Sequence, residues 1–479
     1  MASISSGPAR PPARADIIAG LIVFAIGIAL YLIWPLLTLR VQAPVSPNEG
    51  WEGLLADRAF GAGALYPPRD EFVFNNYPPL SFYLVGGLGR LIGDNIIAGR
   101  VLSLLSVFAI AGNVALIARN LKADAWSALF AGVLLAGIMC KSFTTRYVGI
   151  DDPQLLAHAV MSAGFAVWTA APARTRNLVL SSLLMVLAGL IKHSIIAMPL
   201  AVTVWLLFNN RASAWRWIAV SVLFVAAAIF ACWLAYGAAF FEQVSAARTY
   251  DLYRILTILG WLQSFILPLL IWLVFALRTR PDPVIRLVEM LLIAATFSFL
   301  LTRASEGVSV NALFDLVIAS CIALGVALSR FGEISGIERF GVRRAQRWII
   351  ALLCLRLVIL PQSEFMELVS GSGSAPRFFT TIAPNYQTAL GIMRQAQGPA
   401  LCEDLALCYW SGHQSAYFSY NATIAFLSGT HDVNTLRQQI AGGRYRLIEL
   451  DGNSPLLAAA RASGMTQTTA PGGEIIFTR

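Results

Sequence analysis

Long apolar segments alternate with short polar connections along almost the whole chain. Eleven of the apolar segments approach the roughly 20 residues that a helix needs to cross a bilayer. They cover residues 17–37, 97–118, 125–143, 154–171, 178–191, 193–208, 215–236, 255–277, 285–302, 311–329 and 347–361. A further apolar stretch, residues 80–92, is too short to span and is predicted to lie along the membrane surface. The pattern predicts a polytopic α-helical membrane protein with about 11 transmembrane helices.

Composition supports this prediction. The chain is 57% hydrophobic and only 13% charged, whereas soluble proteins average roughly 45–50% apolar and about 25% charged residues. The net charge of +9 does not indicate nucleic-acid binding, because the basic residues stand in short connections between apolar segments. In that position they set membrane topology.

The basic residues predict the orientation of the chain. With the N-terminus in the cytoplasm, every inner connection carries at least two basic residues, as the positive-inside rule requires. The first polar loop, residues 41–96, and the tail after residue 361 then lie outside the cytoplasm. Arginine greatly outnumbers the three lysines, which suggests a GC-rich bacterial genome. We therefore expect a bacterial inner membrane protein whose C-terminal part is periplasmic.

The tail differs in composition from the rest, so residues 1–361 are predicted to form a membrane module and residues 362–479 a small soluble α/β domain. Strands are predicted at 399–404, 445–451 and 474–478, and helices at 433–441 and 454–463. Cys402 and Cys408 could form a disulfide in an oxidising compartment.

The first outer loop holds an unusual number of carboxylates for so apolar a chain: Glu49, Glu52, Asp57, Asp70 and Glu71. They are either solvated loop charges or part of an active site in which one carboxylate acts as a base. Glu49 is the first candidate for that base and Asp57 the second, because the turn-forming neighbours of Glu49 could aim its side chain.

A second acidic position stands at Asp151-Asp152-Pro153. Adjacent carboxylates before a proline suit an ordinary helix start. They could equally supply oxygen ligands to Mg²⁺ or Mn²⁺.

Basic residues also gather at the outer ends of the apolar segments, against the positive-inside trend. Ammonium and guanidinium groups suit phosphate oxygens, although each residue alone could be an interfacial anchor. The predicted phosphate-binding residues are Lys141, Arg146, Lys192, His193, Arg248 and Arg303.

Four segments, in order, resemble the GT-C superfamily of polyprenyl-phosphate-sugar-dependent glycosyltransferases. The similarity is greatest to the protein O-mannosyltransferase and aminoarabinose-transferase branch, which is glycosyltransferase family 39-like. The segments are Ser46–Gly50, Tyr77–Leu80 followed by Ala98–Ser103, Arg146–Pro153 and Gly189–Lys192. One departure is Asn48, which stands where the family usually has an aspartate. The resemblance implies that the role of catalytic carboxylate passes to Glu49.

The resemblance implies inverting transfer of a sugar from a polyprenyl-phosphate-linked donor to an acceptor hydroxyl on the periplasmic face. The expected partners are membrane lipid, the lipid-linked donor and a glycan, lipid or protein acceptor, with no nucleic acid. Two alternatives stay open: a transporter or flippase of lipid-linked saccharides, and a family member that has lost its activity. A transporter should place ionisable groups near the bilayer midplane, whereas here they collect at the outer ends of the segments.

Overall fold

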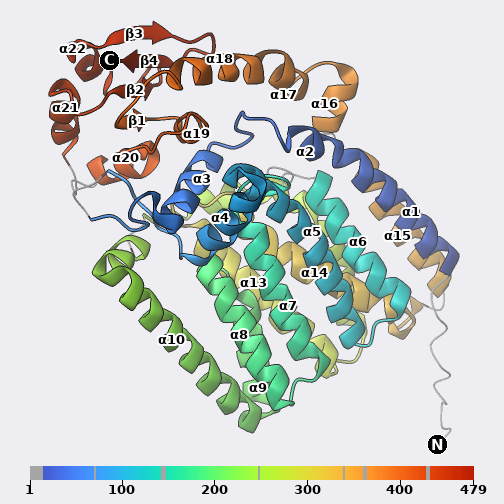
Figure 1. The fold of residues 1–479 in the computed structure, drawn as a ribbon. Coiled ribbons are helices and arrows are strands. Elements are labelled where there is room, and N and C mark those ends of the chain that lie inside the picture. Colours follow the sequence, from blue (N-terminus) through green and yellow to red (C-terminus); the bar gives the residue numbers. More distant parts are fainter. Residues whose placement is uncertain are drawn as a thin grey trace, which may run out of the picture.

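The computed structural model describes residues 14–68, 72–141, 147–245, 249–337, 340–359, 364–427 and 432–479. It has two parts: a bundle of long helices, and a small α/β domain that covers one end of the bundle (Figure 1). The first outer loop, which contains α3 and α4, lies between them (Figure 1).

The bundle and its loops contain fifteen α-helices within the described residues. In chain order they are α1 (Arg14–Tyr31), α2 (Ile33–Thr38), α3 (Glu49–Asp57), α4 (Leu80–Ile92), α5 (Asn95–Asn120), α6 (Ala125–Lys141), α7 (Pro153–Ala170), α8 (Thr175–Ile191), α9 (Ala197–Asn209), α10 (Arg211–Val244), α11 (Tyr253–Leu256), α12 (Ile266–Arg278), α13 (Pro283–Arg303), α14 (Phe314–Ser329) and α15 (Val342–Ile359). Shorter π or 3₁₀ turns are η1 (Arg58–Ala62), η3 (Leu259–Ser264), η4 (Val310–Leu313) and η5 (Phe331–Glu333).

A helix stands at each of the eleven predicted apolar segments, but not all are long and apolar enough to cross a membrane. Among the described residues five helical stretches meet both conditions: Ala15–Thr38, Asn95–Asn120, Arg211–Val244, Pro283–Arg303 and Val310–Ser329. The number rises to seven if each of two bent helix pairs forms one span. The mostly helical, polytopic character is thus confirmed, and the count of eleven stays a prediction.

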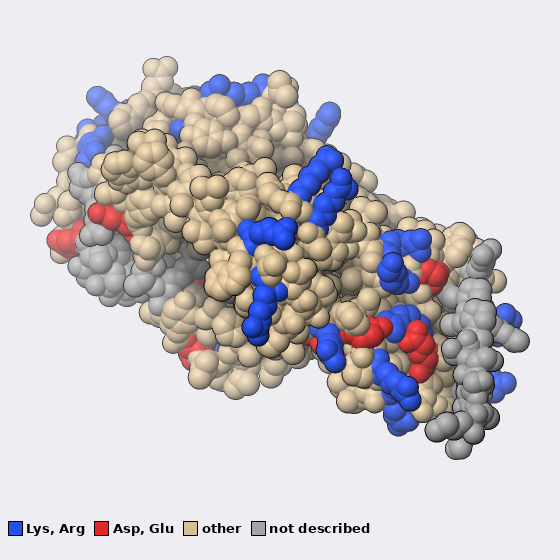
Figure 2. Space-filling view, turned by 90° about the horizontal axis from the view of Figure 1, so that it is seen from below, with Lys and Arg blue, Asp and Glu red and all other residues tan. Residues whose placement is uncertain are grey.

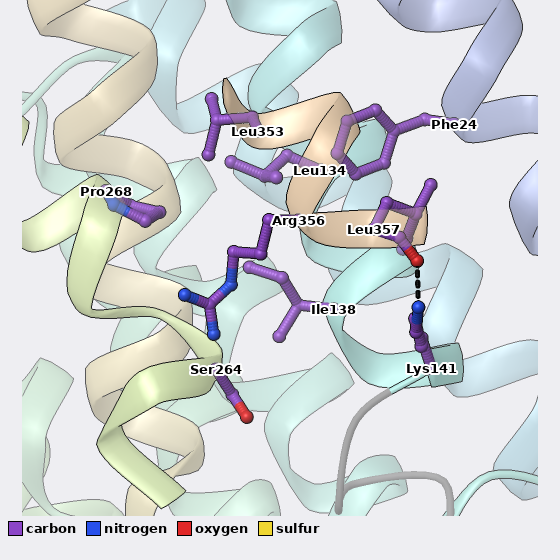
Figure 3. Close-up of a pocket in the computed structure, with 10 residues that line it drawn as sticks. Phe24, Leu134, Ile138, Lys141, Ser264, Pro268, Leu353, Arg356 and Leu357 are labelled. Carbon is purple, nitrogen blue, oxygen red and sulfur yellow. Dashed lines mark hydrogen bonds between the residues drawn. The ribbon is translucent and has the colours of Figure 1, made fainter. Parts of the chain in front are cut away.

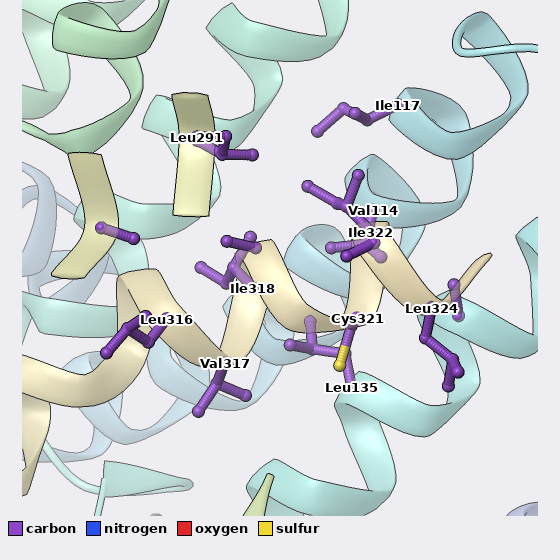
Figure 4. Packing of buried hydrophobic residues seen from close by; sticks show 14 of the residues in the cluster. Val114, Ile117, Leu135, Leu291, Leu316, Val317, Ile318, Cys321, Ile322 and Leu324 are labelled. Carbon is purple, nitrogen blue, oxygen red and sulfur yellow. The ribbon is translucent and has the colours of Figure 1, made fainter. Parts of the chain in front are cut away.

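Helix α14 lies at the centre of the bundle because it is apolar on all sides. Its residues from Phe314 to Leu328 are buried, and Figure 4 shows it packed among side chains of α5, α6 and α13. Small residues allow this close packing: a Cβ atom at Gly325 of α14 would come within 2.8 Å of the Ala131 Cβ atom on α6. Helix α10 is equally apolar but has few buried residues, as expected for a helix that faces lipid.

The bundle end farthest from the α/β domain is basic. Figure 2 shows this end, where Lys and Arg side chains are spread over the surface with fewer acidic ones between them. The connections there contribute Arg119, Lys122, Arg174, Arg176, Arg211, Arg216, Arg278, Arg280 and Arg286. The positive-inside rule predicts that this end faces the cytoplasm.

This orientation leads to a prediction with reporter fusions. Alkaline phosphatase, which is active only in the periplasm, is expected to be active when fused after Arg479 and inactive when fused after Arg343. A cytoplasm-specific reporter at the same two positions is the control and should give the opposite result. The reversed pattern in both series would show that the candidate site faces the cytoplasm.

The C-terminal domain is built on a four-stranded sheet with the order β1-β2-β4-β3. The pair β1–β2 is parallel, and β4 pairs antiparallel with both β2 and β3. Its elements are α16 (Glu364–Ser370), α17 (Ser374–Arg377), η7 (Phe378–Ile382), α18 (Ala383–Met393), β1 (Ala400–Cys402), α19 (Leu405–Trp410), α20 (Ser419–Leu427), α21 (Val433–Ala441), β2 (Leu447–Leu450), α22 (Leu457–Ala462), β3 (Thr466–Thr469) and β4 (Ile475–Thr478). The three predicted strands are present; the prediction missed β3, whose four residues are all exposed and lack an apolar pattern.

Helix α19 joins this domain to the first outer loop. A disulfide between Cys402 and Cys408 links β1 to α19, as the sequence allowed. Helix α3 approaches α19 so closely that a Cβ atom at Gly50 would lie 2.1 Å from the Ala406 nitrogen. The Trp410 indole also donates a hydrogen bond to Asp94, at 2.8 Å. The domain therefore holds α3 against the end of the bundle.

Candidate active site

Four carboxylates and two cations meet where α3 lies over the ends of α5, α7 and α8. We call Glu49, Glu52, Asp151, Asp152, Arg100 and Lys192 the charged cluster. All six residues are buried, with relative exposures between 0% and 9%. Carboxylates outnumber cations by two in the cluster, so these groups cannot all be ionised without strong mutual repulsion.

Glu49, in the first turn of α3, is fully engaged by hydrogen bonds. The Arg100 guanidinium donates to both of its carboxylate oxygens, each at 2.7 Å. The backbone N–H groups of Val45 and Asp151 donate to the same two oxygens, at 2.8 and 3.1 Å. Each oxygen thus accepts two hydrogen bonds, which is its usual capacity. This geometry argues against the predicted role of Glu49 as general base, since no lone pair is left for a substrate proton.

Arg100 organises the backbone around Glu49. Its Nη1 donates to the carbonyls of Thr38 and Val41 at 2.8 and 2.9 Å, and its Nη2 donates to that of Ala43 at 2.9 Å. The preceding residue, Gly99, makes room for Asp151, because a Cβ atom there would lie 1.8 Å from an Asp151 carboxylate oxygen. The Gly99-Arg100 pair therefore ties the first outer loop and the loop before α7 to α5.

Glu52 differs from Glu49, although it is only one helical turn away. Within the described part of the chain its carboxylate makes no hydrogen bond, yet it lies close enough to Asp152 and Lys192 to interact with their charges. Burial raises the pKa of Glu52 well above its usual range, the charge of Asp152 raises it further, and Lys192 opposes the shift. Within the described residues Glu52 thus has a carboxylate that makes no hydrogen bond and has a raised pKa. This combination suits a general base.

Lys192, directly after α8, is a cation whose charge acts on Glu52. Its ammonium lies 3.5 Å from Asp152 and donates a hydrogen bond to the Tyr77 hydroxyl, at 3.2 Å. Burial alone would lower the pKa of Lys192, but Asp152 and the tyrosines Tyr77 and Tyr147 outweigh burial and raise it. Lys192 therefore stays protonated at the edge of the cluster, where Tyr77 is only half-buried.

The two predicted metal ligands, Asp151 and Asp152, make different contacts. Asp152 accepts a hydrogen bond from the Gln154 nitrogen at 2.7 Å, which caps α7, and it pairs with Lys192. Asp151 instead packs against Gly99. Across the described ranges, His, Cys, Asp and Glu side chains form no group of three or more that could hold a metal ion. The donor set therefore does not fit Mg²⁺ or Mn²⁺, and we derive no step through a metal.

The predicted phosphate-binding residues that the structure describes do not form one rim. Lys192 joins the charged cluster, whereas Lys141 contacts Tyr31 and the Leu357 carbonyl elsewhere in the bundle. Arg303 donates to the Thr257 hydroxyl at 2.9 Å and to the Val308 carbonyl, and His193 is exposed. Arg146 and Arg248 lie outside the described residues.

Asp57, the second candidate for the base, lies at the other end of α3. It accepts a hydrogen bond from the Asn95 amide at 2.7 Å and a longer one from Gln414, at 3.5 Å. Asp57 thus helps to connect α3, α5 and the C-terminal domain, away from Lys192. Sequence reasoning named Glu52 only as a loop charge, although its spacing of three residues from Glu49 places both on one helical face.

The class of fold follows from comparisons with known proteins. Residues 76–236 match the sequence model of the dolichyl-phosphate-mannose-protein mannosyltransferase family. This match and the structural ones below confirm the predicted resemblance to GT-C glycosyltransferases that use polyprenyl-phosphate-linked sugars. No curated protein sequence matches the chain.

Among solved structures, the fold is similar to ArnT from Cupriavidus metallidurans. The apo form has a TM-score of 0.65 at 14% identity, covering 97% of this chain and 98% of ArnT. The form bound to undecaprenyl phosphate has a TM-score of 0.66 at 15% identity, covering 95% and 97%. The archaeal oligosaccharyltransferase AglB from Archaeoglobus fulgidus, in complex with an inhibitory peptide and a dolichol-phosphate, has a TM-score of 0.51 at 12% identity, covering 96% of this chain and 74% of AglB.

Proposed function

We propose that this protein transfers a sugar from a polyprenyl-phosphate-linked donor to an acceptor hydroxyl, with inversion at the anomeric carbon. The observation that carries the proposal is the placement of Glu52 within reach of the charge of Lys192. A buried carboxylate, which makes no hydrogen bond within the described residues, and a buried ammonium whose charge acts on it both lie at one end of an apolar bundle. These are the two groups that the reaction needs, a base for the acceptor and a cation for the departing phosphate.

In the proposed step, the acceptor oxygen forms a bond to the anomeric carbon while the bond from that carbon to the phosphate oxygen breaks. The bonding electrons leave with the lipid phosphate, and the hydroxyl proton passes to the carboxylate of Glu52. Attack opposite the leaving phosphate gives inversion.

Lys192 is proposed to stabilise the phosphate as negative charge builds up on its oxygens. Burial makes this interaction stronger than it would be in water. The hydrogen bond to Tyr77 and the ion pair with Asp152 hold the ammonium in place before the donor arrives. Such preorganisation avoids a cost of reorientation during the reaction.

The site is proposed to face the periplasm of a bacterial inner membrane, with a cytoplasmic N-terminus. The basic opposite end of the bundle supports this orientation (Figure 2). A lipid-linked donor fits a reaction outside the cytoplasm, where nucleotide sugars are absent. The acceptor is proposed to be a glycan, a lipid or a protein.

Replacing Lys192 by methionine is expected to weaken binding of a polyprenyl phosphate by about tenfold or more. Charge-assisted hydrogen bonds contribute roughly 1.5–3 kcal/mol, and methionine keeps the apolar stem but not the charge. Binding is measured on the purified full chain in detergent with fluorescently labelled undecaprenyl phosphate.

Lys192→Arg and Tyr77→Phe serve as matched controls for this variant. Arginine keeps the positive charge, and phenylalanine removes only the hydrogen bond that positions the ammonium, so both should lose less affinity than Lys192→Met. Equal affinity in Lys192→Met and the wild type would remove Lys192 from the donor site.

A further inference from the structure

A second group of cations lines a crevice at a different place in the bundle. The crevice lies between α1, α6, α12 and α15 and has a volume of about 30 Å³. Figure 3 shows Lys141 and Arg356 among its lining residues, with Phe24, Leu134 and Leu353 forming part of an apolar wall. Lys141 ends α6 and Arg356 stands in the last turn of α15.

The two cations lie near each other without an acidic partner. Arg356 is close enough to Lys141 for the two positive charges to interact. Within the described ranges neither residue forms an ion pair with a carboxylate. The Nη2 atom of Arg356 is buried and has no hydrogen-bond partner there.

Lys141 does not reach water as an interfacial anchor would, and Arg356 is half-buried. Lys141 is only 4% exposed; its ammonium donates to the Leu357 carbonyl and lies 5.3 Å from the centre of the Tyr31 ring. Two like charges held in an apolar setting are unfavourable unless an anion is present. Within the described residues no carboxylate forms an ion pair with either cation to offset this repulsion.

The surroundings indicate where that anion comes from. Large apolar side chains are exposed on the helices beside the crevice: Ile22 and Ile26 on α1, and Leu352 and Leu355 on α15. Such faces suit contact with lipid chains. The crevice is too small for a whole lipid, so the chains would lie along these faces while the headgroup meets the cations.

We infer that Lys141 and Arg356 bind the phosphate headgroup of a membrane lipid at a site distinct from the charged cluster. The site takes a phosphate that carries alkyl chains, because one part of it is cationic and the remainder apolar. It is independent of the proposed donor site, since Lys141 and Arg356 make no contact with Lys192 among the described residues.

The test measures lipid binding to the purified full chain by native mass spectrometry. The probes are dioleoyl phosphatidic acid, dioleoylglycerol with the same chains but no phosphate, and inorganic phosphate alone. Wild type is expected to retain phosphatidic acid, and Lys141→Met/Arg356→Met to lose about tenfold or more of that affinity. Lys141→Arg/Arg356→Lys, which keeps both charges, should retain most of it and shows that loss is not a folding defect.

Two further variants separate this site from the donor site and from general charge effects. Arg278→Met removes an exposed cation at the opposite end of α12 and should bind phosphatidic acid as wild type does. Lys192→Met should bind phosphatidic acid with the affinity of the wild type. Arg356→Met should bind undecaprenyl phosphate with the affinity of the wild type.

Three outcomes would overturn the inference. If the protein retains dioleoylglycerol as well as phosphatidic acid, the crevice is a purely apolar site. If it retains inorganic phosphate as well as phosphatidic acid, the lipid chains do not contribute to binding. Unchanged phosphatidic acid binding in Lys141→Met/Arg356→Met would remove the two cations from any site. A failure of Lys192→Met to affect undecaprenyl phosphate would instead contradict the proposed donor site and leave this inference intact.

Discussion

Replacing Glu52 by glutamine is expected to lower sugar transfer by about 10²- to 10⁴-fold, the usual contribution of a general base. Glutamine has nearly the same size and polarity but cannot accept the acceptor proton. Transfer is measured in membranes with a radiolabelled lipid-linked sugar, at matched amounts of protein. Asp57→Asn is the control on the same helix, and it should keep most of the activity because Asp57 is hydrogen-bonded to Asn95 away from Lys192.

The pH dependence of transfer provides a second readout. Glu52 accepts a proton only when ionised, so activity should fall as the pH drops through its pKa. Burial raises that pKa above the usual range of a glutamate, so the loss should begin at a higher pH than for an exposed carboxylate. Glu52→Asp should retain a pH-dependent limb, and Glu52→Gln should abolish it.

The stability of the folded protein should change with pH in the opposite direction to sugar transfer. A raised pKa means that the folded state binds the proton more tightly than the unfolded state does, so stability decreases as pH rises from the unfolded pKa to the folded one. Glu52→Gln is therefore expected to melt at a temperature no lower than wild type at neutral pH. A folded, stable Glu52→Gln protein with full turnover would remove Glu52 from the mechanism.

Replacing Arg100 by methionine is expected to destabilise the protein by about 3–5 kcal/mol, the usual cost of breaking a buried ion pair from one side. The change leaves Glu49 buried without its counter-ion and removes donors from the carbonyls of Thr38, Val41 and Ala43. The measurement is the fraction of protein that stays monodisperse after heating in detergent. Arg394→Met is the matched control, because Arg394 also donates to a carbonyl but is exposed.

Glu49→Gln separates a structural role from a catalytic one. We expect it to lose stability, while the protein that remains folded transfers sugar at a rate near that of wild type. The double variant Glu49→Met/Arg100→Met should recover part of the stability lost in Arg100→Met, because neither charge is then buried alone. A Glu49→Gln protein of normal stability but without turnover would return the role of base to Glu49.

Local sequence was enough to predict the positions of most elements. The apolar segments predicted the helices of the bundle, since a segment with so few charges is stable only inside a bilayer or a core. The strands at residues 399–404, 445–451 and 474–478 followed in the same way from short apolar runs. Strand β3 was missed, since an exposed edge strand made of Thr466–Thr469 carries no burial pattern.

The residue types of the site were also visible in the sequence, but their partners were not. Glu49 and Glu52 stand one turn apart on α3, and no local pattern distinguishes a carboxylate that will meet Arg100 from one that will meet Lys192. Only the packing of α3 against α5 decided that Glu49 is enclosed by four donors. Likewise, the predicted phosphate-binding cations looked equivalent until the bundle brought the charge of Lys192 within reach of Glu52 and placed Lys141 with Arg356 in one crevice.

The sequence by itself thus determined which segments are apolar enough to form the helical bundle and which residue types stand in the loops between them. Those properties depend on the transfer free energy of each segment, which is a sum over neighbouring residues. The role of each charged side chain depends on contacts between residues far apart in the chain, such as Glu49 with Arg100. Tertiary structure alone decided those contacts. Burial and charge pairing set the pKa of a carboxylate, and both arise only when the helices pack together.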